Sequence, residues 1–135
     1  MNETSPPDRF PYPRQLVVGS FESEEGLSDA LDALKQRGFD PDGWDVLHGE
    51  QDARSLDPEG TAHGVGGKMI RALQSAFSFE REHAREYAAR LRSGDYVLAV
   101  SVGDNEQAKV RAAEAMRANG GDFINYYADT NIEAL

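Results

Sequence analysis

The sequence contains no cysteine, which excludes disulfide bonds, thiolate metal ligands and a cysteine nucleophile together. It has no run of the ~20 apolar residues that a membrane span needs, and its N-terminal residues have no apolar stretch typical of a secretion signal. The GxSxG motif of serine hydrolases is also absent. We therefore expect a cytoplasmic protein that is neither secreted nor inserted in a membrane.

Positive charge is scarce: the 135 residues include 14 Lys and Arg against 24 Asp and Glu, for a formal net charge of -10. Such a charge repels nucleic-acid phosphates and anionic lipid, so neither is an expected partner. The cations are concentrated between residues 68 and 92, where six of them accompany three glutamates. This basic segment indicates docking on an acidic body or neighbour, an anionic ligand, or a solvated helix face.

The hydrophobic pattern predicts one domain, residues 15–135, after a proline-rich and disordered tail of residues 1–14. Helices are expected after Ser23 and after Asp104, because both residues stand where an N-cap should. Strands are expected at residues 16–21, 44–48, 96–102 and 122–128. Between the second and third strands, residues 49–93 form an insertion of a glycine-rich loop and two helices.

The order of these elements is strand, helix, strand in each half, with the insertion between the halves. It predicts an α+β fold, a ferredoxin-like sandwich built from two βαβ halves. Both helices of such a sandwich cover one face of the sheet, so the inserted helices or a second protomer would cover the other. A small doubly wound α/β sheet is the alternative.

Three stretches carry a resemblance to a known family. They are LVVGSFESEEGLSDALDALKQRGFD, HGVGGKMIRAL and DYVLAVSVGDNEQAKVRAAEAMRANGGDFINYY. Over roughly residues 15–130 the chain resembles the heat-induced, YflT-like general stress proteins of bacteria. The resemblance implies a compact α+β stress-associated domain with no established reaction, and it supplies no catalytic residues.

The glycine-rich helix start at residues 60–71 is the candidate ligand site. It is not a P-loop, because Ala62 replaces the leading glycine and Met69 replaces the metal-binding hydroxyl. Free N–H groups at a helix start can still hold a phosphate or carboxylate. The alternative interpretation is a flexible loop with no ligand. The candidate ligand-binding residues are His63, Gly64, Gly66, Gly67, Lys68 and Arg71.

The histidines His48, His63 and His83 have no spacing typical of a metal site, so we expect no metal. We also expect no cofactor and no enzymatic activity. The aromatic strand is most simply core, and a binding role is its second interpretation. The apolar tail after it would cross to a partner subunit. The candidate interface residues are Phe123, Tyr126, Tyr127, Ile132 and Leu135.

These observations favour a non-enzymatic stress-associated domain that acts through self-association, as a homodimer, or through another protein–protein interaction. The alternative is a module that binds a small anionic ligand, a phosphate or nucleotide-like compound, at the glycine-rich helix start.

Overall fold

The computed structural model describes residues 15–56, 73–74, 76–77, 80–128 and 131–135. Five strands within them form one sheet in the order β2-β3-β1-β4-β5. Each of the four pairings is antiparallel. The protein therefore has an α+β fold, as predicted. The doubly wound alternative is wrong, because that architecture is built mostly from parallel neighbours.

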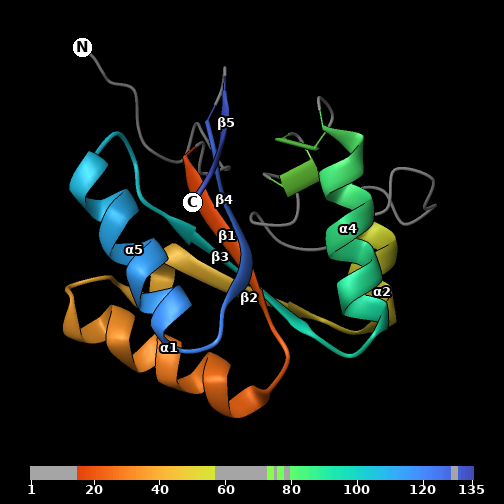
Figure 1. Ribbon diagram of the computed structural model, residues 1–135, viewed down its shortest axis with the longest axis horizontal. Helices are drawn as coiled ribbons and strands as arrows, with labels where there is room; N and C mark the ends of the chain where they lie inside the picture. The colour runs from red at the N-terminus through yellow and green to blue at the C-terminus, as the bar shows by residue number, and fades with distance from the viewer. Residues whose placement is uncertain (1–14, 57–72, 75, 78–79, 129–130) are drawn as a thin grey trace.

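Four strands lie within one residue of where the sequence predicts them. They are β1 (Leu16–Phe21), β2 (Trp44–His48), β3 (Tyr96–Ser101) and β4 (Asp122–Tyr127). All six residues of β1 are buried, and this strand lies between β3 and β4. Helices cover both faces of the sheet (Figure 1), which explains why β1 is almost continuously apolar.

Helices α1 (Glu24–Gln36) and α5 (Glu106–Ala118) follow β1 and β3 and cover one face of the sheet (Figure 1). The predicted cap of α1 is confirmed, since Ser23 Oγ accepts a hydrogen bond from the Gly26 N–H at 3.0 Å. Gly38 follows the end of α1 with a φ of +92°, the left-handed conformation that ends a helix.

The predicted cap of α5 is wrong by one residue. Asn105 caps this helix, and its side-chain oxygen accepts from the N–H groups of Gln107 at 2.9 Å and Ala108 at 3.1 Å. Asp104 instead accepts a hydrogen bond from the side chain of Gln15, at 3.2 Å. The capping pattern marks the right turn of the chain, but two adjacent residues both have a suitable side chain.

Helices α2 (Gly49–Leu56) and α4 (Arg81–Arg92) cover the opposite face. The sequence predicts a loop where α2 lies, and this prediction is wrong because Ala53 and Leu56 pack into the core. The described residues 73–74 and 76–77 are helical, in line with the first of the two predicted inserted helices. The second face is therefore covered by the insertion itself.

The sheet separates two hydrophobic clusters. We call them the α4-side core and the α5-side core. The α4-side core includes Val18, Leu47, Leu73, Phe77, Tyr87, Leu91, Val97 and Tyr127. The α5-side core includes Val17, Phe21, Leu34, Leu98, Val100, Ala112, Met116 and Ile124. Among the described residues no helix is long and apolar enough to cross a membrane.

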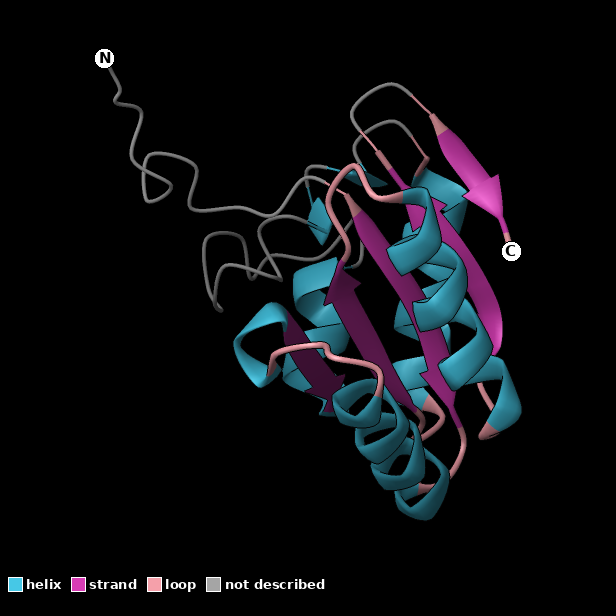
Figure 2. Cartoon of the chain, turned by 90° about the vertical axis from the view of Figure 1, so that its left-hand side faces the viewer, coloured by secondary structure: helices cyan, strands magenta, loops and turns pink. Residues whose placement is uncertain are grey.

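The C-terminal residues form a strand that the sequence does not predict. Strand β5 (Ile132–Ala134) pairs with β4 of the same chain, with Glu133 opposite Tyr126. The Leu135 N–H donates to the Ile124 carbonyl at 2.9 Å, and Leu135 packs against the α5-side core. The tail predicted to cross to a partner thus completes its own sheet as the outermost strand, beside the C-terminus in Figure 2.

Candidate functional site

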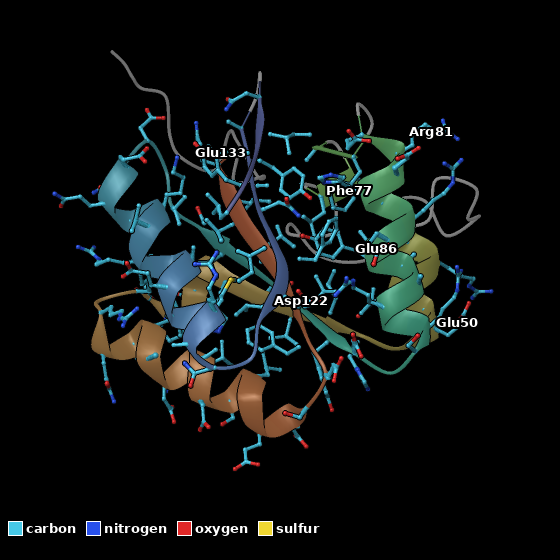
Figure 3. All side chains as sticks on the ribbon, in the orientation of Figure 1. Glu50, Phe77, Arg81, Glu86, Asp122 and Glu133 are labelled. Atoms are coloured by element: carbon cyan, nitrogen blue, oxygen red, sulfur yellow. The ribbon has the colours of Figure 1, made fainter. Side chains whose placement is uncertain are left out.

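The basic segment contacts acidic residues of other elements. Arg92 Nε lies 3.2 Å from Glu50 Oε1 on α2, and Arg90 donates to Asp122 Oδ2 on β4 at 3.0 Å. The Arg90 guanidinium lowers the pKa of the Asp122 carboxyl. Arg81 points away from the sheet at the start of α4 (Figure 3). Docking on acidic neighbours therefore explains the C-terminal end of this segment.

The predicted anion site lies outside the part of the chain that the structure describes, so the ligand hypothesis stays a prediction. Its residues are His63, Gly64, Gly66, Gly67, Lys68 and Arg71.

The two described histidines lie on different elements. His48, at the end of β2, is exposed and stacks on Tyr96 with ring centroids 4.1 Å apart. His83, on α4, has its Nδ1 2.6 Å from the Tyr127 hydroxyl. No group of three or more possible metal ligands exists among the described residues. Since His63 lies outside them, the expectation of no metal stays a prediction.

Strand β4 bulges where it pairs with β1. The register between these strands shifts between Val18 and Ser20, so that Gly19 faces an extra residue of β4. Phe123 in the bulge has a φ of 50°, which non-glycine residues rarely adopt. A side chain at Gly19 would be crowded, because a Cβ there would lie 3.0 Å from Cγ1 of Ile124.

Tyr87 of α4 holds this bulge in place. Its hydroxyl lies 2.7 Å from the Phe123 carbonyl and 3.2 Å from the Val18 carbonyl. Asn125 donates to the Tyr87 hydroxyl and to the Phe123 carbonyl, each at 3.1 Å. The carbonyl that the bulge turns out of the ladder is thus paired, as a buried polar group must be. We call Tyr87, Phe123 and Asn125, with Tyr127 and His83, the bulge network.

The two tyrosines of the bulge network are buried and protonated. Burial raises the pKa of Tyr87. Burial also raises the pKa of Tyr127, and the neighbouring Tyr87 adds to that shift. Both phenols are therefore neutral at ordinary pH and act as hydrogen-bond donors. Tyr87 is 0 % exposed and Tyr127 is 1 % exposed, so neither hydroxyl is open to a substrate.

The predicted interface residues lie in different surroundings. Tyr127 is buried in the α4-side core, and Phe123 packs against that core. Tyr126 and Leu135 are half-buried against the α5-side core. Ile132 alone among the five is exposed, by 36 %. The buried Tyr127 offers no surface for an interface, which corrects that part of the prediction and leaves Ile132 as the accessible anchor.

The outer edge of β2 is closed by carboxylates. The Val46 N–H donates to Asp45 Oδ1 at 2.9 Å, and the His48 N–H donates to Asp52 Oδ2, also at 2.9 Å. Asp52 comes from the first turn of α2. An added strand would have to displace both carboxylates to pair with these N–H groups. The β2 edge is thus protected against strand addition.

Among the residues that the structure describes, none bonds to the outer edge of β5. The Leu135 N–H donates inward to the Ile124 carbonyl, and alternation along the strand gives Glu133 the same orientation. The N–H groups of Ile132 and Ala134 therefore point outward. Within the described residues, no hydrogen bond from either group is found. This strand presents a free ladder edge that is three residues long.

Two cations of α5 hold β5 against the body of the protein. Lys109 Nζ lies 2.7 Å from Glu133 Oε1 and 3.0 Å from Glu106 Oε1, with only 9 % of its side chain exposed. The hydrogen bonds that Lys109 donates to these carboxylates, Glu133 first, raise the pKa of Lys109. Arg117 donates to the Leu135 carbonyl. The strand is therefore anchored on its inner side and free on its outer side.

Sequence reasoning missed the residues that distinguish the two edges. Nothing in the sequence marks Asp45 or Asp52 as an edge cap, because aspartates are abundant and the role depends on where α2 begins. Lys109 did leave a signal. It shares a helix face with Ala112 and Met116, so a lysine stands where the apolar stripe of α5 needs a small residue.

A shallow hollow of about 300 Å³ lies beside the bulge end of β4 and the C-terminus, where its lining includes Arg117, Asp122 and Leu135. Comparison with known proteins adds no assignment: no family model, curated protein or solved structure matches this sequence.

Proposed function

We propose that this protein is a non-enzymatic, stress-associated domain that acts by pairing with a second copy of itself through the outer edge of β5. The stress role rests on the sequence resemblance to general stress proteins. For the fold we propose a ferredoxin-like sandwich. The units β1–α1–β2 and β3–α5–β4 and the strand order β2-β3-β1-β4 support it.

The difference between the two sheet edges is the observation that carries the proposal. Helices cover both faces of the sheet, so the edges are where its backbone can meet another chain. At β2 the outward N–H groups of Val46 and His48 are bound by carboxylates. At β5 those of Ile132 and Ala134 are open. Proteins that avoid strand addition protect both edges of a sheet. In this protein the carboxylates protect the β2 edge, and no such group binds the outward N–H groups of β5 among the described residues.

A second copy is the partner that best fits this edge. An antiparallel strand pair obeys two-fold symmetry, so each outward N–H of β5 meets a carbonyl of the other β5. A three-residue ladder buries little area, which supports a weak dimer whose population depends on concentration. The net charge of -10 on each copy opposes the encounter, so salt should strengthen association.

The test compares two exposed apolar side chains. Ile132 is 36 % exposed on β5, and Val110 is 42 % exposed on α5. We expect the mass of the unmodified protein in sedimentation equilibrium to rise from monomer to dimer with concentration. Ile132→Lys should keep it monomeric, because a lysine on an edge strand blocks strand pairing. Val110→Lys makes the same charge change on helix α5 and not on the edge strand, so it leaves the β5 ladder intact and should dimerise normally.

Two results would contradict the proposal. The first is a monomeric mass for the unmodified protein at all concentrations and salt strengths. The second is equal loss of the dimer in Ile132→Lys and Val110→Lys, which would place the contact elsewhere.

A further inference from the structure

The length of β5 selects one register for the proposed dimer. Each outward N–H group of one copy must meet an outward carbonyl of the other. A residue whose backbone groups point outward therefore pairs only with another such residue. One register pairs all three residues of each strand: Ile132 lies opposite the partner's Ala134, and Glu133 lies opposite its own copy. The two-fold axis then passes between the two Glu133 residues.

This register brings two carboxylates together. Residues directly opposite one another in an antiparallel pair have Cβ atoms roughly 4.5–5.5 Å apart, and like charges placed so are destabilising. Both Glu133 side chains lie on the same face of the joined sheet, the face that α5 covers, because each reaches Lys109. Unless each glutamate is neutralised, like-charge repulsion would weaken pairing at this edge.

Lys109 supplies the neutralising charge. Its Nζ lies 2.7 Å from Glu133 Oε1 and 4.8 Å from the centre of the Tyr126 ring, so the ammonium is held at the inner end of the carboxylate. The second carboxylate on Lys109 comes from Glu106, 3.0 Å away on its own helix and 75 % exposed. Glu133 is the middle residue of β5 and is labelled in Figure 3.

We propose that Lys109 is the residue that permits self-association, by neutralising Glu133 at the two-fold axis of a β5–β5 dimer. The inference rests on the proposed function and names the residue on which the association depends. Without the charge of Lys109, the two Glu133 carboxylates would repel one another across the edge. Lys109 is a positioning residue here, because it acts through Glu133 and does not itself cross the interface.

The experiment measures the dimer dissociation constant by sedimentation equilibrium for four full-length proteins. Lys109→Met keeps an apolar side chain of similar length over Tyr126, and we expect it to weaken the dimer roughly fivefold at low salt. Lys109→Met/Glu133→Gln should restore the affinity to about that of the unmodified protein, because the facing carboxylates are gone. Lys35→Met removes an exposed lysine from the last turn of α1 and should have no effect.

Each result decides a separate point. A dimer of unchanged affinity in Lys109→Met overturns the inference while the proposed function stands. So does failure of Glu133→Gln to rescue that variant. A monomeric unmodified protein overturns the proposed function itself. Loss of folding does not obscure these results, because the glutamates left behind by Lys109→Met are 49 % and 75 % exposed and can be hydrated. Thermal melts of all four proteins verify this.

Discussion

At the scale of single residues, Tyr87 and Tyr127 couple stability to alkaline pH. Burial raises both pKa values above the ordinary 10.0 of a tyrosine. Above pH 10 the unfolded chain therefore loses these two protons while the folded protein keeps them. Folded proteins that hold more protons than their unfolded chains lose stability as pH rises. Each tyrosine should lower the free energy of unfolding by about 1.4 kcal/mol per pH unit in this range.

The measurement is urea unfolding at intervals from pH 8 to pH 11. The unmodified protein should lose stability steeply above pH 10, and Tyr87→Phe should show a shallower slope because one of the two groups is gone. Its stability at pH 8 should be lower by about 1 kcal/mol, the typical value of the lost hydrogen bonds. An unchanged slope in Tyr87→Phe would show that this phenol is accessible to base in the folded protein.

At the scale of elements, Asn105 caps helix α5, and the adjacent Asp104 does not. Asn105 accepts two backbone hydrogen bonds at the start of α5, whereas Asp104 accepts one from the side chain of Gln15. We expect Asn105→Ala to cost about 1 kcal/mol of stability. Asp104→Ala should cost a few tenths of a kcal/mol, as ordinary surface changes do. Equal losses in chemical denaturation would mean that either residue can serve as the cap.

Strands β1 to β4 and the helices α1 and α5 were predictable, because the hydrophobic pattern of each segment matches the side chains that it buries in the fold. The apolar run of β1 suits a strand with helices on both faces, and the spacing of Leu27, Ala30 and Leu34 suits a helix with one buried face. Helix α2 and strand β5 were not predictable. The segment that forms α2 begins with a glycine and has low hydrophobicity, and it is helical because Ala53 and Leu56 reach the core.

The candidate site was less predictable than the fold. The apolar character of Ile132 in a polar tail predicts an anchor there; the side chain is exposed, and its role stays a prediction. The bulge network was not foreseen, because Tyr87 and Asn125 meet only through a register shift between β1 and β4 that no local pattern marks. The contrast between the two edges depends on tertiary position in the same way, since Asp52 caps β2 from a neighbouring helix.

At the scale of the whole molecule, the protected β2 edge would limit the proposed association. In the proposed dimer, pairing at β5 uses the open edge of each copy, so the assembly would close at two. Asp45→Ala/Asp52→Ala frees the Val46 and His48 N–H groups and gives each copy a second open edge. We expect this variant to form species larger than a dimer as concentration rises, which light scattering detects.

The control for this prediction is Asp29→Ala/Asp32→Ala, which removes two exposed carboxylates from α1 and changes the net charge equally. This control should stop at the dimer. If the edge variant also stops there, another part of the molecule covers β2, and the aspartates are not what limits assembly.

The central position of β1 also affects how the chain is made. This strand leaves the ribosome first, yet its partners β3 and β4 begin at Tyr96 and Asp122. At a synthesis rate of about 5–20 residues per second, the roughly 80 residues between Leu16 and Tyr96 take on the order of 10 s. During this interval the strand whose six residues are all buried in the folded protein has neither neighbour to pair with. We therefore expect the nascent chain to be prone to aggregation until its second half emerges.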